Sequence, residues 1–360
     1  MNAVAADAKP VLVVGSASIH VARFVRGLCD AGQAVVLATH GELSMAPHPL
    51  LLEQHSMHFG VANWRAPAQL RALMARVQPR VLHAHQANSV GWHAARAAAG
   101  GAVPLVLTLW GSDVLSTPSR SPFHRWMVGR ALRGANAWTA DARVLIEAGE
   151  RLAGRRAERI EREWIPLGID TPPAPSNAQE RRILSCRLHK PLYRIDSILR
   201  AFARLPARLA DWRLEVAADG PQAPALKQLA HELGIAGRVE FTGMLDPAGL
   251  ARSYRRAAIF VSVPTSDGTS VSLLEAMGAG CTPVLSDLPA NREWVVDGSN
   301  GWLVDDLASL DQALLHAIER WESGAWAREG APHNAALIRE RAYFPTNIRQ
   351  FLALYARLAG

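Results

Sequence analysis

The sequence predicts an α/β protein with two Rossmann-like, doubly wound parallel sheets. Three observations predict this class. Short β-branched apolar runs alternate with longer segments of helical period, a pattern typical of parallel sheets covered by helices. The alternation occurs twice, on either side of a segment rich in Pro, Ser and Asn at 165–179. The length of 360 residues also exceeds the roughly 250–300 residues that one hydrophobic core usually holds.

The first half of the chain predicts one sheet. Its strand candidates are short runs such as "VLVVG", and segments such as "IHVARFVRGLCDAG" have the apolar spacing of a helix packed on a sheet. The expected strands cover 11–15, 34–39, 80–85 and 104–111, and the expected helices cover 19–32 and 67–77.

The second half repeats the pattern without an internal repeat of fixed period. Its expected strands cover 182–187, 213–220, 238–243, 258–263, 283–287 and 301–304. Helices are expected at 195–205, 224–234 and 271–279, the last ended by Gly280, a residue that readily adopts the left-handed conformation of a helix end. Ligands of open parallel sheets bind at the carboxyl ends of the strands, so the active site is expected in a cleft between two such sheets.

The charge and composition of the chain limit the kinds of partner that it is expected to bind. The net charge of +7 and the pI near 9.9 favour an anionic partner: nucleic acid, a lipid surface or a phosphorylated small molecule. Only three residues are lysine, and the arginines form no basic tail, which weakens the nucleic-acid option.

No apolar run approaches the ~18–20 residues of a membrane span, and residues 1–15 lack the order of a secretory signal, so a cytoplasmic protein is expected. The three cysteines are expected in the core.

The stretch "SDGTSVSLLEAMGAGCTPVLSD" (266–287) carries the strongest functional signal. It reads as a strand end, a small-residue loop and a helix, which offers backbone amides and a partial positive charge to a phosphate. Asp267 lies before the helix and Glu275 lies about one turn inside it, and carboxylates accept hydrogen bonds from sugar hydroxyls. The pair could therefore hold a ribose and a hexose on either side of a diphosphate.

This stretch, followed by "NREWVVDGSNGWLV" (291–304), resembles the signature of the family-four retaining glycosyltransferases of the GT-B fold. Further matching pieces are "ILSCRLHKPLYRIDSILRAFARL", "ADGP", "VEFTGML", "SYRRAAIFVSVP", "RVLHAHQANSVGWHAA", "LVLTLWGSDVL", "IPLGID" and the final "NIRQFLALYARL". The resemblance covers nearly the whole chain. It implies an acceptor-binding domain at 1–168, a donor-binding domain at 169–342, and a last segment, 343–360, that returns to the first domain.

For the second domain, the resemblance implies a nucleotide-sugar site. Glu275 would hold the ribose, Asp267 stands where the family usually has Glu and would bond the donor sugar, and Arg187 would neutralise the leaving phosphate. The Lys that usually accompanies that Arg is out of register, so either Lys190 or Arg194 would serve. The other donor-binding candidates are Gly268, Thr269, Ser270, Val271, Ser272, Met244 and Leu245.

For the first domain, the resemblance implies a sugar-contacting histidine and an acceptor pocket. His85, the second histidine of "LHAH", would contact the transferred sugar, whereas His83 is not expected to do so. Trp110 replaces the histidine often found at its position, and Asp113 matches an acidic position near the cleft. Gly15, Ser16 and His20 form a loop for phosphate or acceptor.

The expected reaction is transfer of a hexose from a UDP-sugar or GDP-sugar to an acceptor hydroxyl, with retention and without a metal or other cofactor. The acceptor would be a glycan or a lipid-linked molecule in cell-envelope synthesis, and the arginine-rich segments 119–134 and 151–163 would dock on the inner, anionic membrane surface. No nucleic-acid partner is expected. Two alternatives stay open: a sugar phosphorylase on the same fold, and a non-catalytic nucleotide-sugar-binding or scaffolding partner. The absence of GxGxxG, P-loop, CxxC and GxSxG motifs disfavours dehydrogenase, NTPase and serine-hydrolase activities.

Overall fold

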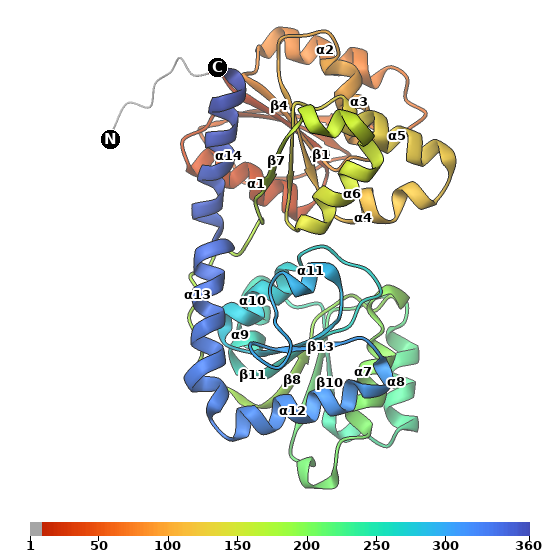
Figure 1. The fold of residues 1–360 in the computed structure, drawn as a ribbon, viewed down its shortest axis with the longest axis vertical. Coiled ribbons are helices and arrows are strands. Elements are labelled where there is room, and N and C mark those ends of the chain that lie inside the picture. The colour runs from red at the N-terminus through yellow and green to blue at the C-terminus, as the bar shows by residue number, and fades with distance from the viewer. Residues whose placement is uncertain (1–8) are drawn as a thin grey trace. The chain divides into compact units, whose positions relative to one another are not determined.

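The computed structural model describes residues 9–360; residues 1–8, the start of the segment in which no secretory signal was expected, lie outside it. The chain divides into two compact units (Figure 1). Unit 1 consists of residues 9–167 and 344–360, and unit 2 consists of Gly168–Tyr343. Each unit is an α/β domain with one parallel sheet, as the sequence predicts.

Unit 1 is built on a seven-stranded parallel sheet with the order β3-β2-β1-β4-β5-β6-β7. Its central strands are short and fully buried, which is why β-branched and apolar residues fill them. The strands are β1 (Val11–Ser16), β2 (Val35–His40), β3 (Leu51–Met57), β4 (Val81–His85), β5 (Leu105–Leu109), β6 (Ala137–Ala140) and β7 (Glu161–Trp164).

Helices cover both faces of this sheet. One face is packed by α1 and by α14, the last helix of the chain, and the other by α2, α3, α5 and α6. Figure 1 shows α14 and α5 on opposite sides of the unit. The helices are α1 (Ile19–Asp30), α2 (Ala66–Val77), α3 (Ser89–Ala98), α4 (Ser112–Leu115), α5 (Pro122–Arg133), α6 (Arg143–Ala153) and α14 (Phe344–Ala359).

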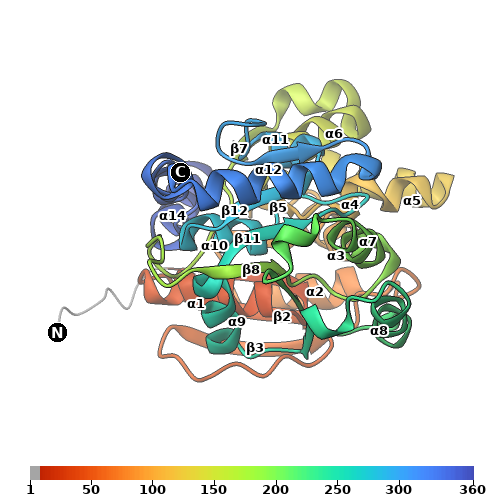
Figure 2. The same ribbon diagram turned by 90° about the horizontal axis from the view of Figure 1, so that it is seen from below.

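Unit 2 has a six-stranded parallel sheet with the order β10-β9-β8-β11-β12-β13. Figure 2 shows β8 and β11 at the middle of the unit, with α7 and α8 on one side and α9 and α10 on the other. The strands are β8 (Glu180–Ser185), β9 (Arg213–Ala217), β10 (Val239–Gly243), β11 (Ala257–Ser262), β12 (Thr282–Ser286) and β13 (Trp302–Val304). The helices are α7 (Ile195–Ala203), α8 (Ala223–Glu232), α9 (Pro247–Arg256), α10 (Val271–Ala279), α11 (Pro289–Arg292), α12 (Leu310–Glu322) and α13 (Ala331–Arg341).

Both sheets reverse their strand order beside their first strand. In unit 1 the reversal lies between β1 and β4, and in unit 2 it lies between β8 and β11. At such a point the loops leave neighbouring strands toward opposite faces, which opens a crevice outside the carboxyl ends. The topology therefore gives each unit one preferred ligand position.

The last helix, α14, belongs to the core of unit 1, as the sequence predicts for a returning segment. Phe351 is fully buried and its ring centroid lies 4.9 Å from that of Phe24 in α1. Tyr355 is also fully buried and its hydroxyl forms a hydrogen bond with Nδ1 of His83 in β4. His83 Nε2 in turn lies 2.6 Å from the Thr108 hydroxyl of β5. His83 is thus a structural link between the helix and two strands.

Three strands that the sequence analysis missed, β3, β6 and β7, lie toward the edges of the unit 1 sheet. β3 alternates between half-buried and exposed residues, and β7 has the polar sequence "EREW". Edge strands are held by backbone hydrogen bonds to one neighbour and bury little side-chain area, so they lack a strong apolar signal. β6 is apolar but only four residues long.

The cysteines need one correction. Cys29 and Cys281 are buried as expected, whereas Cys186 is only half-buried and follows β8 directly. Its Sγ lies 3.2 Å from the Tyr254 hydroxyl. All three thiols are free, and burial raises the pKa of each, so the thiols stay protonated and unreactive at neutral pH.

Candidate functional site

The ligand position of unit 2 holds an arginine and an aspartate from neighbouring strands. Arg187 follows β8 and Asp267 lies in the loop after β11, the two strands that flank the reversal of strand order. A guanidinium nitrogen of Arg187 lies 2.7 Å from Oδ2 of Asp267. The two side chains are only 12% and 24% exposed, so this ion pair is screened less than a surface pair.

Two further contacts fix the Arg187 guanidinium. Its other terminal nitrogen donates to the hydroxyl of Ser270, the residue directly before α10. Its central carbon lies 4.5 Å from the ring centroid of Tyr193, within the range of a cation–π contact. The sequence analysis missed Tyr193, because no motif marks an aromatic residue in a short turn. The spacing of only six residues from Arg187 was the one available signal.

Burial and charge act in opposite directions on this pair. Burial works against the charged form of Arg187, but Asp267 and Tyr193 more than compensate, and the pKa of Arg187 is raised. Burial likewise raises the pKa of Asp267, while Arg187 and the Gly268 amide oppose that rise. The guanidinium is therefore a permanent, oriented positive charge at the carboxyl edge of the sheet.

The start of α10 presents backbone amides beside that charge. No side chain caps this helix among the described residues, because the Ser270 hydroxyl faces Arg187 instead. The first-turn amides of Val271 and Ser272 therefore remain available for an anion. Thr269 anchors the loop before α10, because its buried hydroxyl accepts a hydrogen bond from the Trp294 indole at 3.1 Å.

The second basic residue next to Arg187 has two candidates with different surroundings. Arg194 adopts a left-handed backbone conformation, and its guanidinium donates to the carbonyls of Val263 and Pro264 at 2.6 and 2.8 Å. It thereby ties the turn that carries Tyr193 to the end of β11. Lys190 is exposed. Of the two, Lys190 has the charge that is free to reach a ligand, and Arg194 acts as a structural tie.

The remaining unit 2 candidates spread along the same edge. Glu275 is half-buried on α10, one turn from its start. Burial raises the pKa of Tyr254, and Cys186 and Glu275 add to this rise. Met244 and Leu245 follow β10, two strands away from β8, and the Met244 side chain is 67% exposed. The structure thus brings Arg187, Asp267 and Ser270 together and leaves Met244 and Leu245 apart from them.

The ligand position of unit 1 lies at the ends of β1 and β4. Gly15 and Ser16 close β1, and His85 closes β4. A Cβ atom at Gly15 would lie 2.7 Å from Cγ2 of Val21 and 3.5 Å from Cβ of His85, so only glycine lets the strand pass this close to α1. The hydroxyl of Ser18 caps α1 by accepting from the Val21 amide at 3.3 Å.

Three aromatic rings gather at this point. The Trp110 ring centroid lies 5.4 Å from that of His20 and 5.5 Å from that of His85. His85 is fully buried, and within residues 9–360 neither of its ring nitrogens has a hydrogen-bond partner; the indole nitrogen of Trp110 is in the same state. Burial, with a smaller contribution from His20, lowers the pKa of His85 to about 3, so the ring is neutral at pH 7. Buried polar atoms of this kind normally have partners, which favours a hydrogen-bonding ligand here.

Asp113, expected as an acceptor or cleft residue, is buried, and backbone amides occupy its carboxylate. It is 1% exposed, and its oxygens accept from the amides of Ala87, Trp110 and Val114 at 2.7, 3.0 and 3.1 Å. These contacts join the loop after β4 to the loop after β5. Asp113 therefore positions Trp110 through the backbone.

The described residues contain neither a candidate metal centre nor a membrane-spanning helix. Over residues 9–360, no group of three or more His, Cys, Asp or Glu side chains is arranged to hold a metal ion. Over the same residues, no helix has both the length and the apolar character needed to cross a membrane.

Comparison with known families gives the site its context. The model described as "Glycosyl transferase 4-like" matches residues 10–142, in unit 1, and "Glycosyl transferases group 1" matches residues 181–320, in unit 2. The chain belongs to the family-four glycosyltransferases. The residues of this glycosyltransferase that the second match covers include the Arg187, Asp267 and α10 group.

Two curated relatives show how far the sequence similarity of this glycosyltransferase extends. A "phosphatidyl-myo-inositol mannosyltransferase" of Mycolicibacterium smegmatis is 28% identical over 341 residues, which is 85% of this chain and 82% of the relative. An "alpha-monoglucosyldiacylglycerol synthase" of Streptococcus pneumoniae is 36% identical over 124 residues, but this covers only 34% of the chain and 28% of the relative.

Solved structures confirm the fold class of the glycosyltransferase as GT-B. A crystal structure of Anabaena Alr3699/HepE in complex with UDP superposes with a TM-score of 0.78 at 17% identity. The match covers 97% of this chain and all of the Anabaena chain.

Proposed function

We propose that this glycosyltransferase moves a hexose from a nucleoside diphosphate sugar, a UDP-sugar or a GDP-sugar, to an acceptor hydroxyl with retention of configuration. The observation that carries the proposal is the oriented guanidinium of Arg187 at the strand-order reversal, beside Asp267 and the uncapped start of α10. A charge and two amides at this position suit a diphosphate, and the carboxylate suits the hydroxyls of a sugar.

The proposed reaction exchanges one bond at the anomeric carbon. The bond from this carbon to the β-phosphate oxygen breaks, and its electron pair stays on the phosphate. The acceptor oxygen bonds to the same face of the carbon, and its proton passes to the departing phosphate. Negative charge thus grows on the diphosphate, where Arg187, Lys190 and the amides of Val271 and Ser272 stabilise it.

The other candidates then take binding roles. Glu275 would accept hydrogen bonds from the ribose, and Asp267 from the hexose. In unit 1 the buried nitrogens of His85 would bind a sugar hydroxyl. Fixed positive charge at the phosphate supports a metal-independent reaction. UDP in the Anabaena neighbour and the lipid substrates named in the curated relatives make UDP-sugars and lipid or glycan acceptors the first substrates to test.

The ribose contact gives a direct test of the donor site. We expect Glu275→Gln to weaken binding of the preferred nucleoside diphosphate by about tenfold, because a hydrogen bond to a charged group contributes roughly 1.5 kcal/mol or more. The measurement is a calorimetric titration with the nucleotide and with its 2′-deoxy and 3′-deoxy analogues.

The analogues separate a ribose contact from a general loss of structure. In the wild-type protein, removal of the contacted hydroxyl should cost about as much as the substitution. In Glu275→Gln, the ribose form and the deoxy form should bind with nearly equal affinity. If the variant still discriminated between them as strongly as the wild-type protein does, Glu275 would not hold the ribose.

A further inference from the structure

One stretch of unit 1 has an unusual charge. Residues 58–140 contain nine arginines and a single acidic residue, Asp113, although the whole chain has 32 acidic residues. Asp113 is buried and its oxygens are occupied by backbone amides, so it adds no exposed negative charge. The arginines are Arg65, Arg71, Arg76, Arg80, Arg96, Arg120, Arg125, Arg130 and Arg133.

The fold gathers these arginines on one side of the unit, except Arg80, which precedes β4 and whose charge acts on Tyr355 of α14. The stretch forms α2, α3 and α5, which pack side by side on the sheet face away from α1 and α14 (Figure 1). Of the nine arginines, only Arg76 has a carboxylate partner among the described residues, Glu53. The outer surface of α2, α3 and α5 therefore carries a positive charge that the protein itself does not neutralise.

Aromatic side chains lie among these arginines. Trp92 of α3 contacts Phe123 and Trp126 of α5, with ring centroids 6.4 and 6.2 Å away, and the two α5 rings lie 5.9 Å apart. Phe123 is 45% and Trp126 is 50% exposed, so the cluster faces solvent. Near the start of α2, Trp64 is 73% exposed.

The helix α5 is apolar on two faces, which a helix packed on a sheet does not require. Its inner face buries Met127, Val128, Ala131 and Leu132. Phe123, Trp126 and Arg130 follow one another at spacings of three and four residues, so they share the outer face. The inner face explains the packing on the sheet, whereas the outer aromatic pair contacts Trp92 and still leaves about half of its surface to solvent.

Guanidinium groups stand directly against these rings. Arg96 lies 4.9 Å from the ring centroid of Trp92, and Arg65 lies 5.1 Å from that of Trp64. Tryptophan is favoured at the boundary between lipid headgroups and acyl chains, and each basic residue near an anionic lipid surface contributes about 1 kcal/mol of attraction. This pairing of aromatic and basic residues fits a bilayer interface better than a free aqueous surface.

The aromatic residues also lie at a particular end of their helices. Trp64 precedes α2, Trp92 is in the first turn of α3, and Phe123 and Trp126 are near the start of α5. Helices that connect parallel strands run back against them, so their amino ends lie at the edge where the strands end. That edge of unit 1 carries His85 and Trp110.

We propose that the outer surface of α2, α3 and α5 docks on an anionic membrane, with Phe123, Trp126 and Trp64 inserted at the headgroup level. The proposal goes beyond the proposed function and does not depend on it. A docked unit 1 would hold its His85 edge near acceptors that lie in the bilayer surface.

Vesicle flotation tests this surface without nucleotide or acceptor. The full chain is mixed with vesicles of phosphatidylcholine alone or of equal parts phosphatidylcholine and phosphatidylglycerol, at low and high salt. We expect binding to the anionic vesicles, weakened by salt, and little binding to neutral ones. The double variant Phe123→Ser/Trp126→Ser and the double variant Arg125→Glu/Arg130→Glu should each reduce binding by at least about tenfold.

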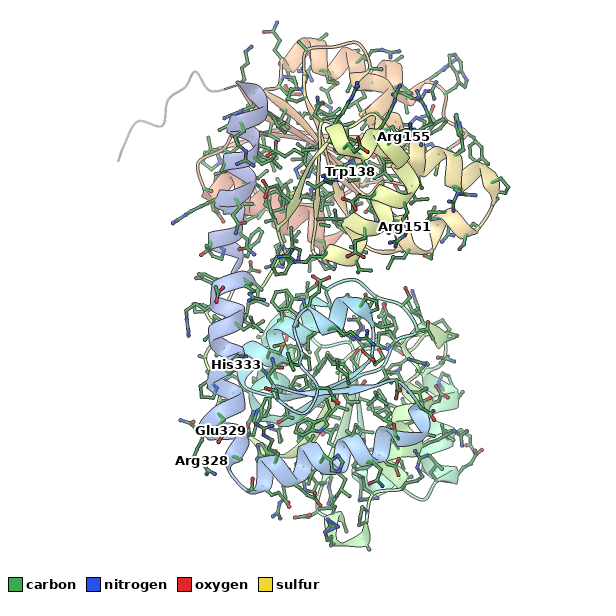
Figure 3. The ribbon with its side chains drawn as sticks, viewed as in Figure 1. Trp138, Arg151, Arg155, Arg328, Glu329 and His333 are labelled. Carbon is green, nitrogen blue, oxygen red and sulfur yellow. The ribbon has the colours of Figure 1, made fainter. Side chains whose placement is uncertain are left out.

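Matched variants keep the result specific. Leu52→Ser removes an apolar side chain of similar exposure, 52%, from β3 of the same unit. Arg328→Glu reverses an exposed charge in unit 2 (Figure 3). Both variants should bind vesicles as the wild-type protein does. Thermal unfolding and nucleotide titration check that every variant is folded, because neither measurement requires lipid.

Several outcomes would overturn the proposal. These are no binding to anionic vesicles at low salt, equal binding to both vesicle types, or equal binding by the aromatic double variant and the wild-type protein. Binding to a random DNA duplex through these residues, without vesicle binding, would assign the surface to nucleic acid instead. Vesicle binding without any nucleotide binding would leave the docking surface standing and contradict only the donor site.

Discussion

Replacement of Arg187 by glutamine is expected to lower turnover by about 30- to 150-fold, which corresponds to about 2–3 kcal/mol of lost transition-state stabilisation. The reason is the placement of the guanidinium at the strand-order reversal of unit 2, where Asp267, Ser270 and Tyr193 hold it in one orientation. A fixed charge stabilises the negative charge that grows on a leaving diphosphate more than the charge of the bound donor. Turnover should therefore fall more than donor affinity.

A steady-state comparison of kcat and KM, with direct titration of the donor, checks this split. Arg204→Gln is the matched control, because Arg204 also pairs with an aspartate, Asp311, at 3.0 Å, but follows the carboxyl end of α7 and so lies at the opposite edge of the sheet. Arg187→Lys should keep part of the activity, since it retains the charge but loses the flat, two-pronged geometry. Equal losses in kcat and in donor affinity for Arg187→Gln would show that the residue only binds the donor.

Replacement of Asp267 by asparagine is expected to separate nucleotide binding from transfer. The Asp267 carboxylate lies 2.7 Å from the guanidinium that the phosphate would use. Loss of its negative charge should raise the affinity for the free nucleoside diphosphate by about tenfold, because the carboxylate no longer competes with the phosphate for the Arg187 guanidinium. Turnover should fall by at least about tenfold, because the hexose loses a charged hydrogen-bond acceptor.

Asp267→Glu provides the control for this prediction, because it keeps the charge and adds one methylene. It should bind nucleoside diphosphate like the wild-type protein and change mainly the choice among donor sugars. A loss of nucleoside diphosphate affinity in Asp267→Asn would mean that the carboxylate supports the phosphate site through Arg187 and does not compete with the ligand.

The sequence predicts the buried parts of the fold well. Strands such as 11–15 and 258–263 are short apolar runs because both of their faces are covered, and this leaves a strong pattern. β3 and β7 were missed because an edge strand with one partner needs no such pattern. The order of strands, which determines where each ligand position lies, comes from pairings between distant segments that periodicity does not reveal.

The candidate site likewise has a part that the sequence predicts and a part that it does not. The helix at 271–279 and the loop before it follow from local signals, so Asp267 could be named from the sequence. Arg187 was named from the family resemblance, and Tyr193 was missed. The roles of Lys190 and Arg194 could not be separated, because the left-handed turn at Arg194 and its contacts with two carbonyls depend on the end of β11. The backbone contacts of Asp113 could not be predicted, because its three amide partners come from two different loops.

The central claim, that unit 2 holds a nucleoside diphosphate without a metal, is tested most directly by titration calorimetry with UDP, GDP and ADP in the presence of EDTA. We predict that one nucleotide binds the wild-type protein and that Arg187→Gln binds it more weakly, while Arg204→Gln binds it unchanged. If none of the three bound, or if Arg187→Gln bound as well as the wild-type protein, the donor site would not be the one described, and a scaffolding role would be favoured.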